Sequence, residues 1–180
     1  MINERIEIWK KEEYHYPAAH GFIPVMFSYI HEDEKKHPAM IIAPGGAYRE
    51  VSPSEAHLPA MEFYGAGYNV FVLEYTINQL DEAPLKMQPL HDISRAIRMI
   101  RSRAEEFHIR PDRIAVCGFS AGAHLCGSLS DLAFPVSDHF SYSLQYHLLL
   151  PNPTPHHLDI SILFSEHLSV SIYFLLQIRH

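Results

Sequence analysis

The sequence is poor in the features that define several classes of protein. It has only two cysteines in 180 residues, which is too few for a disulfide framework and suits a reducing compartment. No apolar run reaches the length of about 18 residues that a membrane-spanning helix needs, so no membrane span is expected. The charged stretch 1–16 contains no apolar segment of the kind found in signal peptides, so we expect a cytoplasmic protein.

Positive charge is also scarce. The chain has 14 lysines and arginines against 21 aspartates and glutamates, and its formal net charge is −7. Because no basic stripe is present, nucleic acid is not expected as a partner. The adjacent His156 and His157 lack further ligands at a suitable spacing, so neither a metal ion nor another cofactor is expected. A hydrophobic content of 47% indicates a globular chain with a core.

Most of the chain alternates between predicted strands and helices. Apolar and β-branched runs predict the strands, and helical periodicity predicts the helices. The first two strands favour an antiparallel hairpin, and the later strand–helix alternation favours a mostly parallel, doubly wound sheet with helices on both faces. Strands are expected at 5–9, within 21–37, and at 38–44, 68–76 and 112–120, and helices at 54–66, 89–109 and 121–133.

Residues 116–125, VCGFSAGAHL, contain a G-x-S-x-G pattern centred on Ser120. A serine hydroxyl becomes an effective nucleophile only when a base takes its proton. A sharp strand-to-helix turn exposes the hydroxyl and directs a helix N-terminus at the developing negative charge. Because a β-branched run precedes the pattern and a helical stretch follows it, we predict that Ser120 is a catalytic nucleophile. The flanking Cys117 and Cys126 are interpreted as reduced thiols of the core.

A second motif, APGGAY at residues 43–48, matches the loop that would complete an oxyanion hole. Such a hole needs backbone N–H groups that converge on the carbonyl oxygen of the substrate, and losing one donor costs about 3 kcal/mol. One donor is expected to be the N–H of Ala121, directly after the serine. The other is expected from Gly46 or Ala47, because the loop follows the third predicted strand.

Together with the stretch YNVFVLEYT and the segment from Pro89 to Leu125, these motifs resemble the α/β-hydrolase esterases of the acetyl-esterase and acetylxylan/feruloyl-esterase type. The resemblance covers residues 14–130, and Ala47 and Ala123 stand where these esterases often have glycine. It implies a carboxylic-ester hydrolase with a serine nucleophile, an acid and a histidine, acting on small acyl groups such as sugar acetates. A small-molecule ester is therefore the expected partner.

The character of the sequence changes near residue 132. All eight glycines and all five lysines precede this point, and the last 49 residues carry only four charged side chains. We therefore expect an N-terminal part of a hydrolase domain at 1–131, and an atypical tail at 132–180 that is not a separate domain. The resemblance implies a longer C-terminal half, so the expected fold is truncated on that side. An out-of-frame reading of the coding DNA would also explain the change.

The expected acid and base of the site are not identifiable in the tail. Asp138 with His156 or His157, or Asp159 with His167, keeps the chain order serine, acid, histidine. His124 lies one helical turn beyond Ser120 and is interpreted as a residue of the helix behind the turn. The alternative to an esterase is therefore a catalytically inactive remnant without the acid and base, whose surface at most binds a ligand or a partner.

The predicted strand at 112–120 raises a question of assembly. In a complete hydrolase sheet this strand is central, whereas here later strands are not clearly predicted. The tail segments 158–165 and 168–178 could each form a strand and pair with each other, or they could equally be apolar segments without a settled place in the fold. An uncovered apolar edge pairs readily with another chain, so self-association is expected unless the tail covers it.

Overall fold

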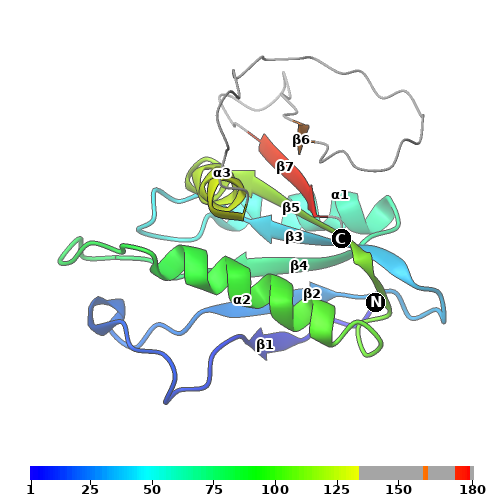
Figure 1. Ribbon diagram of the computed structural model, residues 1–180, viewed down its shortest axis with the longest axis horizontal. Helices are drawn as coiled ribbons and strands as arrows, with labels where there is room; N and C mark the ends of the chain where they lie inside the picture. The colour runs from blue at the N-terminus through cyan, green and yellow to red at the C-terminus, as the bar shows by residue number, and fades with distance from the viewer. Residues whose placement is uncertain (134–159, 162–172, 179–180) are drawn as a thin grey trace.

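The computed structural model describes residues 1–133, 160–161 and 173–178. One sheet forms its centre, and three α-helices and two short 3-10 helices connect or cover the strands (Figure 1). The elements in chain order are β1 (Arg5–Glu7), η1 (Pro17–Ala19), β2 (Val25–Tyr29), β3 (His37–Ala43), η2 (Pro53–Glu55), α1 (His57–Gly65), β4 (Asn69–Glu74), α2 (Gln88–Ser102), β5 (Ile109–Phe119), α3 (Ala121–Ala133), β6 (Ile160–Ser161) and β7 (Tyr173–Ile178).

The described sheet has the strand order β1-β2-β4-β3-β5-β7-β6. Its centre is parallel, because β3 pairs in parallel with both β4 and β5. Both sides are antiparallel: β1 pairs with β2 and β2 with β4 on one side, and β7 pairs with β5 and β6 on the other. The sheet is therefore mixed rather than mostly parallel, since only the strand–helix–strand connections at its centre require parallel neighbours.

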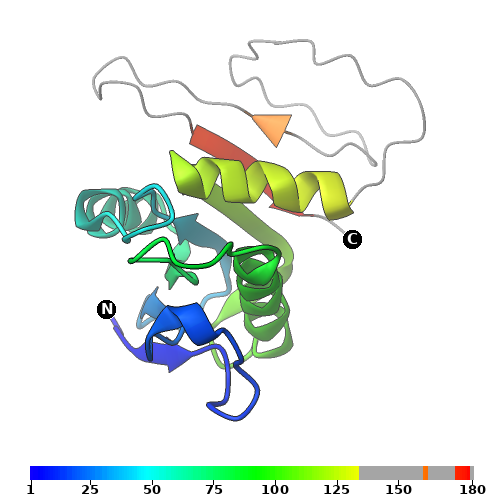
Figure 2. The ribbon, with the colours of Figure 1, turned by 90° about the vertical axis from the view of Figure 1, so that its left-hand side faces the viewer.

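Helices cover both faces of the sheet, as the alternation of strands and helices predicts. Alternate residues of β3 point to opposite faces: Ile41 packs in the cluster that includes Ile93 and Ile100 of α2, whereas Ile42 packs in the cluster that includes Ala60 of α1. Helix α3 joins the α2 side. Figure 2 shows α1 and α2 on opposite sides of the strands. These residues are fully buried, which is why the strands consist of nearly continuous apolar runs.

The expected strands and helices are present, and the bounds of several of them differ from the prediction. The helix expected at 89–109 ends at Ser102, and Phe107 still reaches the core, where its ring contacts Phe71 at 5.1 Å between centroids. Strand β5 begins at Ile109, three residues before the predicted start. The antiparallel hairpin of β1 and β2 is confirmed. In the described part of the chain, no helix is both long and apolar enough to cross a membrane.

Strand β7 lies along β5 from Ile114 to Phe119, with Val116 opposite Leu176. Strand β7 therefore pairs with the edge of β5 that would otherwise be open. Strand β6 pairs with β7, which is one of the two alternatives that the sequence left open for the tail segments. The tail residues that were considered as the acid and base of the site lie outside the described residues, namely Asp138, His156, His157, Asp159 and His167.

Candidate active site

Ser120 lies between the last residue of β5 and the first residue of α3, in a backbone conformation that serine rarely adopts. Its φ is +48°, in the left-handed region, and its side chain is exposed. Such a conformation costs about 1–3 kcal/mol and persists only where the surrounding structure enforces it. The N–H of His124 donates to the Ser120 carbonyl at 3.1 Å, which closes the first turn of α3. The serine is therefore presented at a sharp strand-to-helix turn.

The two glycines of the motif are required by close packing. A Cβ atom on Gly118 would lie 2.2 Å from the carbonyl oxygen of Gly122, and a Cβ on Gly122 would lie 1.9 Å from the carbonyl oxygen of Ala43. Both distances are far below any real Cβ contact. The glycines thus let α3 start directly above β5 and beside the end of β3, which brings the Ser120 turn and the loop after β3 together.

The loop after β3 lies against Ser120, where the sequence predicted it. A Cβ built on Gly45 would lie 2.9 Å from the Cβ of Ser120, so these two residues are in contact distance. The following residues turn sharply: Gly46 has φ +128°, Ala47 φ +53° and Tyr48 φ +60°. Two consecutive non-glycine residues in the left-handed region are uncommon and are typical of functional loops. Ala121 begins α3, where helix N–H groups have no intrahelical partner.

One peptide unit at the start of this loop is held from both sides. The Tyr75 hydroxyl donates to the carbonyl oxygen of Pro44 at 2.6 Å. The N–H of the next residue, Gly45, donates to Oε2 of Glu55 at 2.8 Å. Both bonds fix the orientation of the Pro44–Gly45 peptide and, through it, the loop that carries Gly46 and Ala47. Burial raises the pKa of the Tyr75 hydroxyl, so it remains a neutral donor.

Tyr48 connects the same loop to α3. Its hydroxyl lies 2.9 Å from Nδ1 of His124, and the two rings meet edge to face with centroids 5.9 Å apart. Burial raises the pKa of Tyr48 to about 12, so the hydroxyl stays protonated at neutral pH. The His124 side chain thus contacts the loop. No described interaction joins it to the Ser120 hydroxyl.

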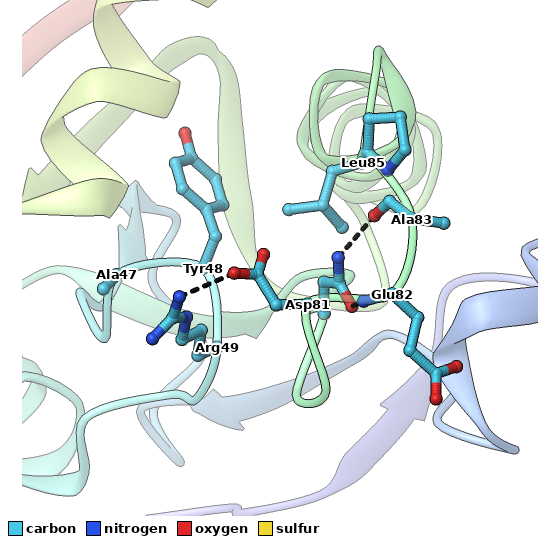
Figure 3. A pocket seen from close by; sticks show the side chains of 9 residues that line it. Ala47, Tyr48, Arg49, Asp81, Glu82, Ala83 and Leu85 are labelled. Carbon is cyan, nitrogen blue, oxygen red and sulfur yellow. Dashed lines mark hydrogen bonds and ion pairs between the residues drawn. The ribbon is translucent and has the colours of Figure 1, made fainter.

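Two adjoining pockets open at this end of the sheet. The first, of about 570 Å³, contains Ser120 and is lined by Gly46, Ala47, Arg49, Glu50, Ser52, Glu55, Gln79 and Ser120. The second, of about 340 Å³, is lined by Ala47, Tyr48, Arg49, Asn78, Asp81, Glu82, Ala83, Pro84 and Leu85 (Figure 3). Ala47 and Arg49 line both, so the loop after β3 forms the boundary between them. Within the described residues, the Ser120 pocket has a polar lining and contains no histidine.

The two cysteines beside the motif are free and buried, in agreement with their interpretation as core thiols. Burial raises the pKa of Cys117 to about 12 and also raises that of Cys126, so neither is a thiolate at neutral pH. In the described part of the chain, no group of three or more histidine, cysteine, aspartate or glutamate side chains could hold a metal ion.

The structure therefore brings together Ser120, Ala121, Gly46 and Ala47, the residues that the motifs singled out. It adds Glu55 and Tyr75, which the sequence analysis did not identify. Tyr75 is the residue after β4, and Glu55 precedes α1, so neither belongs to a recognisable motif. In the sequence, the only indication of the role of Glu55 is that a single carboxylate lies ten residues beyond Gly45.

Solved structures of similar fold include hydrolases. An alpha/beta hydrolase enzyme from a Medee basin deep-sea metagenome library matches 72% of this chain with 34% identity and a TM-score of 0.60, over 50% of its own chain. An acetyl ester-xyloside bifunctional hydrolase from Caldicellulosiruptor lactoaceticus matches 68% of this chain with 32% identity and a TM-score of 0.61, over 44% of its own chain. The fold is that of the α/β-hydrolases.

Within this class, the chain belongs to the BD-FAE family, whose family model matches residues 28–133. A curated relative, endo-1,4-beta-xylanase B from Butyrivibrio fibrisolvens, is 48% identical over 126 residues. This match covers 70% of the present chain and 20% of that protein, so the chain spans about a fifth of its curated relative.

Proposed function

We propose that this protein is a serine carboxylic-ester hydrolase in which Ser120 is the nucleophile. The observation that carries the proposal is the placement of Ser120 at φ +48° beside the loop of Gly45, Gly46 and Ala47, with both lining one pocket. A hydrolase needs its nucleophile exposed and its oxyanion donors pre-arranged, because charge develops at a fixed position in the transition state. Membership of a family related to esterases supports the same reaction.

The proposed reaction has two steps. The Ser120 hydroxyl attacks the ester carbonyl carbon while a base takes its proton. The carbonyl oxygen then becomes an oxyanion between the N–H of Ala121 and that of Gly46 or Ala47. The bond to the alcohol breaks, the alcohol leaves with the proton, and the acyl group remains on Ser120. Water then attacks the acyl-serine and releases the carboxylic acid.

We further propose small acyl groups, such as acetyl groups on sugars, as the substrate class. The relative from Caldicellulosiruptor lactoaceticus is named for acetyl esters and xylosides, and the Butyrivibrio relative is named a xylanase. The polar lining of the pocket, with Ser52, Gln79 and Arg49, offers hydrogen bonds to a hydroxyl-rich alcohol and suits this class.

The second candidate is an inactive binding protein, because the described residues that line the Ser120 pocket include no histidine to serve as the base of a serine hydrolase. The pairs expected from sequence, Asp138 with His156 or His157 and Asp159 with His167, lie outside the described residues. Without a base, the oxyanion hole and substrate binding alone would leave an acceleration of about 10³–10⁴ over water.

Turnover of an activated aryl acetate separates the two candidates. The wild type is compared with Ser120→Ala and with Ser128→Ala, a control serine on the same helix. The esterase proposal predicts that Ser120→Ala loses several orders of magnitude, that Ser128→Ala is unchanged, and that one of His156, His157 or His167 is equally sensitive. A rate near background that Ser120→Ala does not alter supports the inactive candidate.

A further inference from the structure

We propose that the Ser120 pocket selects its ligands by charge, admitting positively charged and neutral esters and rejecting negatively charged ones. This inference adds a substrate preference to the proposed function, and its consequence for catalysis rests on that function. It starts from the charged side chains that line the two pockets. Arg49 is the only described lining residue with a permanent positive charge, and four of the described lining residues are carboxylates: Glu50, Glu55, Asp81 and Glu82.

The positive charge of Arg49 is already paired. Its guanidinium Nη2 lies 2.7 Å from Oδ2 of Asp81, and Figure 3 shows the two side chains directed at each other. Glu82 points away from this pair, and its carboxylate lies 2.9 Å from Nε2 of His20. An anionic ligand therefore meets no uncommitted cation among the described lining residues of either pocket.

Among the described residues, Glu50 and Glu55 are the carboxylates that line the Ser120 pocket itself. A Cβ built on Gly45 would lie 2.5 Å from Oε2 of Glu55 and 2.9 Å from the Cβ of Ser120, so the carboxylate and the serine approach the same point. A Cβ built on Gly46 would lie 3.0 Å from Cγ of Glu50. The two glutamates flank the glycine loop, and no described ion pair neutralises either of them.

This negative charge is compatible with an oxyanion hole. The partial positive charge of N–H groups at a helix start acts over the first turn only, at hydrogen-bond contact. The charge of a carboxylate acts over a longer range, and a pocket lined by one sign of charge concentrates ligands of the opposite sign by about 10-fold or more. A transient oxyanion is thus held at contact, whereas a permanent anion elsewhere on the ester is repelled. The carboxylate product is repelled as well, which favours its release.

The test measures the potential at residue 120 without requiring catalysis. In a Ser120→Cys variant of the full chain, the new thiol reacts with three methanethiosulfonates that share an ethyl chain: the neutral hydroxyethyl reagent, the cationic trimethylammonioethyl reagent and the anionic sulfonatoethyl reagent. Rates are divided by those of free 2-mercaptoethanol, so that the intrinsic reactivity of each reagent cancels. Cys117 and Cys126 contribute little background, because they are buried and their pKa values are raised.

We expect the normalised rate to fall in the order cationic, neutral, anionic, with about a 10-fold difference between the two charged reagents at low salt. The difference should shrink near 1 M salt, where the screening length is about 3 Å. Glu50→Gln should reduce it several-fold, whereas Glu34→Gln, an exposed control outside both pockets, should not. Equal normalised rates, a reversed order, or a thiol that no reagent reaches would each overturn the inference.

The result is separable from the proposed function. The expected charge order in the cysteine variant, combined with no Ser120-dependent ester turnover by the wild type, rejects the esterase and keeps the charge selection. Equal normalised rates for the three reagents, combined with strong Ser120-dependent turnover by the wild type, reject the charge selection and keep the esterase.

Discussion

The backbone N–H of Gly45 donates a 2.8 Å hydrogen bond to Oε2 of Glu55, and this bond ties the glycine loop beside Ser120 to the segment that precedes α1. Together with the bond from Tyr75 to the carbonyl of Pro44, it fixes the peptide that leads into the proposed oxyanion donors. The donors can then be in place before the substrate binds, which is the condition for electrostatic stabilisation of a transition state.

Glu55 should therefore affect the catalytic step more than binding. Replacing Glu55 with Ala removes the acceptor, and we expect kcat to fall by about 10- to 100-fold with a small change in KM, less than the loss of a direct oxyanion donor. Glu55→Gln keeps an acceptor oxygen and should restore most of kcat. Steady-state kinetics on an aryl acetate measure both constants. Glu62→Ala, an exposed control on α1, should match the wild type. A larger effect on KM than on kcat would contradict this role.

The glycines of the Ser120 turn should be sensitive to a single added methyl group. Gly122→Ala places a Cβ 1.9 Å from the carbonyl oxygen of Ala43, and we expect a loss of about 1–3 kcal/mol in the free energy of unfolding from overpacking. Gly127→Ala is the matched control on the same helix, because its Cβ meets no atom within 4 Å. It should gain about 0.5–1 kcal/mol from the better helix propensity of alanine.

Urea denaturation of the two variants measures both changes. Equal effects at the two positions would contradict the packing of α3 against the end of β3.

Asp92 should link stability to pH. It is fully buried and accepts hydrogen bonds from Nε1 of Trp9 at 2.8 Å, from the N–H of Thr76 at 2.8 Å and from Nε2 of Gln88 at 2.9 Å. Burial is the largest effect and raises its pKa. The folded state therefore favours the protonated carboxyl. The contribution of Asp92 to the free energy of unfolding is fully present below its pKa in the unfolded chain, about 4. This contribution is lost as pH rises through the higher pKa of the folded state.

Asp92→Asn is expected to lose about 1–3 kcal/mol, because the amide group cannot accept all three hydrogen bonds. The stability difference between wild type and variant should narrow as pH rises from about 4, since only the wild type then buries a charge. Urea unfolding across this pH range measures the difference. A difference that widens with pH would contradict the raised pKa.

The pairing of β7 with β5 gives a prediction about association. A chain that ends at residue 172 lacks β7 and leaves the β5 edge unpaired, with apolar residues such as Val116 and Cys117 in that strand. We propose that this shortened chain self-associates through the open edge, whereas the full chain does so less. Size-exclusion chromatography with light scattering compares the two at equal concentration. A shortened chain that stays monomeric would contradict the proposal.

Local patterns in the sequence predicted those parts of the site whose conformation is set by residues close together in the chain. The strand-to-helix turn at Ser120 and the glycine loop at Gly45 both follow from short motifs, and the structure places them together. Glu55 was not predictable in this way, because its contact with Gly45 depends on how the chain folds back after the loop. The end of α2 at Ser102 was also missed, since Phe107 keeps an apolar spacing that fits a longer helix.

The antiparallel pairing of β7 was also not predictable from local patterns, because it depends on contacts between distant parts of the chain. Alternating strands and helices indicate parallel neighbours, and this holds for β3, β4 and β5. The pairing of β7 is antiparallel and joins residues far apart in the chain, as with Cys117 opposite Leu175. Register over such a separation is set by long-range packing, which apolar runs in the tail do not specify.

The central claim is that Ser120 carries the acyl group of the substrate. It is tested most directly by mixing the full chain with an aryl acetate, quenching in acid and locating any added acetyl group by peptide mass spectrometry. We predict that acetylation is found on Ser120, is absent in Ser120→Ala and is retained in Ser128→Ala. The absence of any acetyl-serine, or acetylation that is unchanged in Ser120→Ala, would contradict the claim.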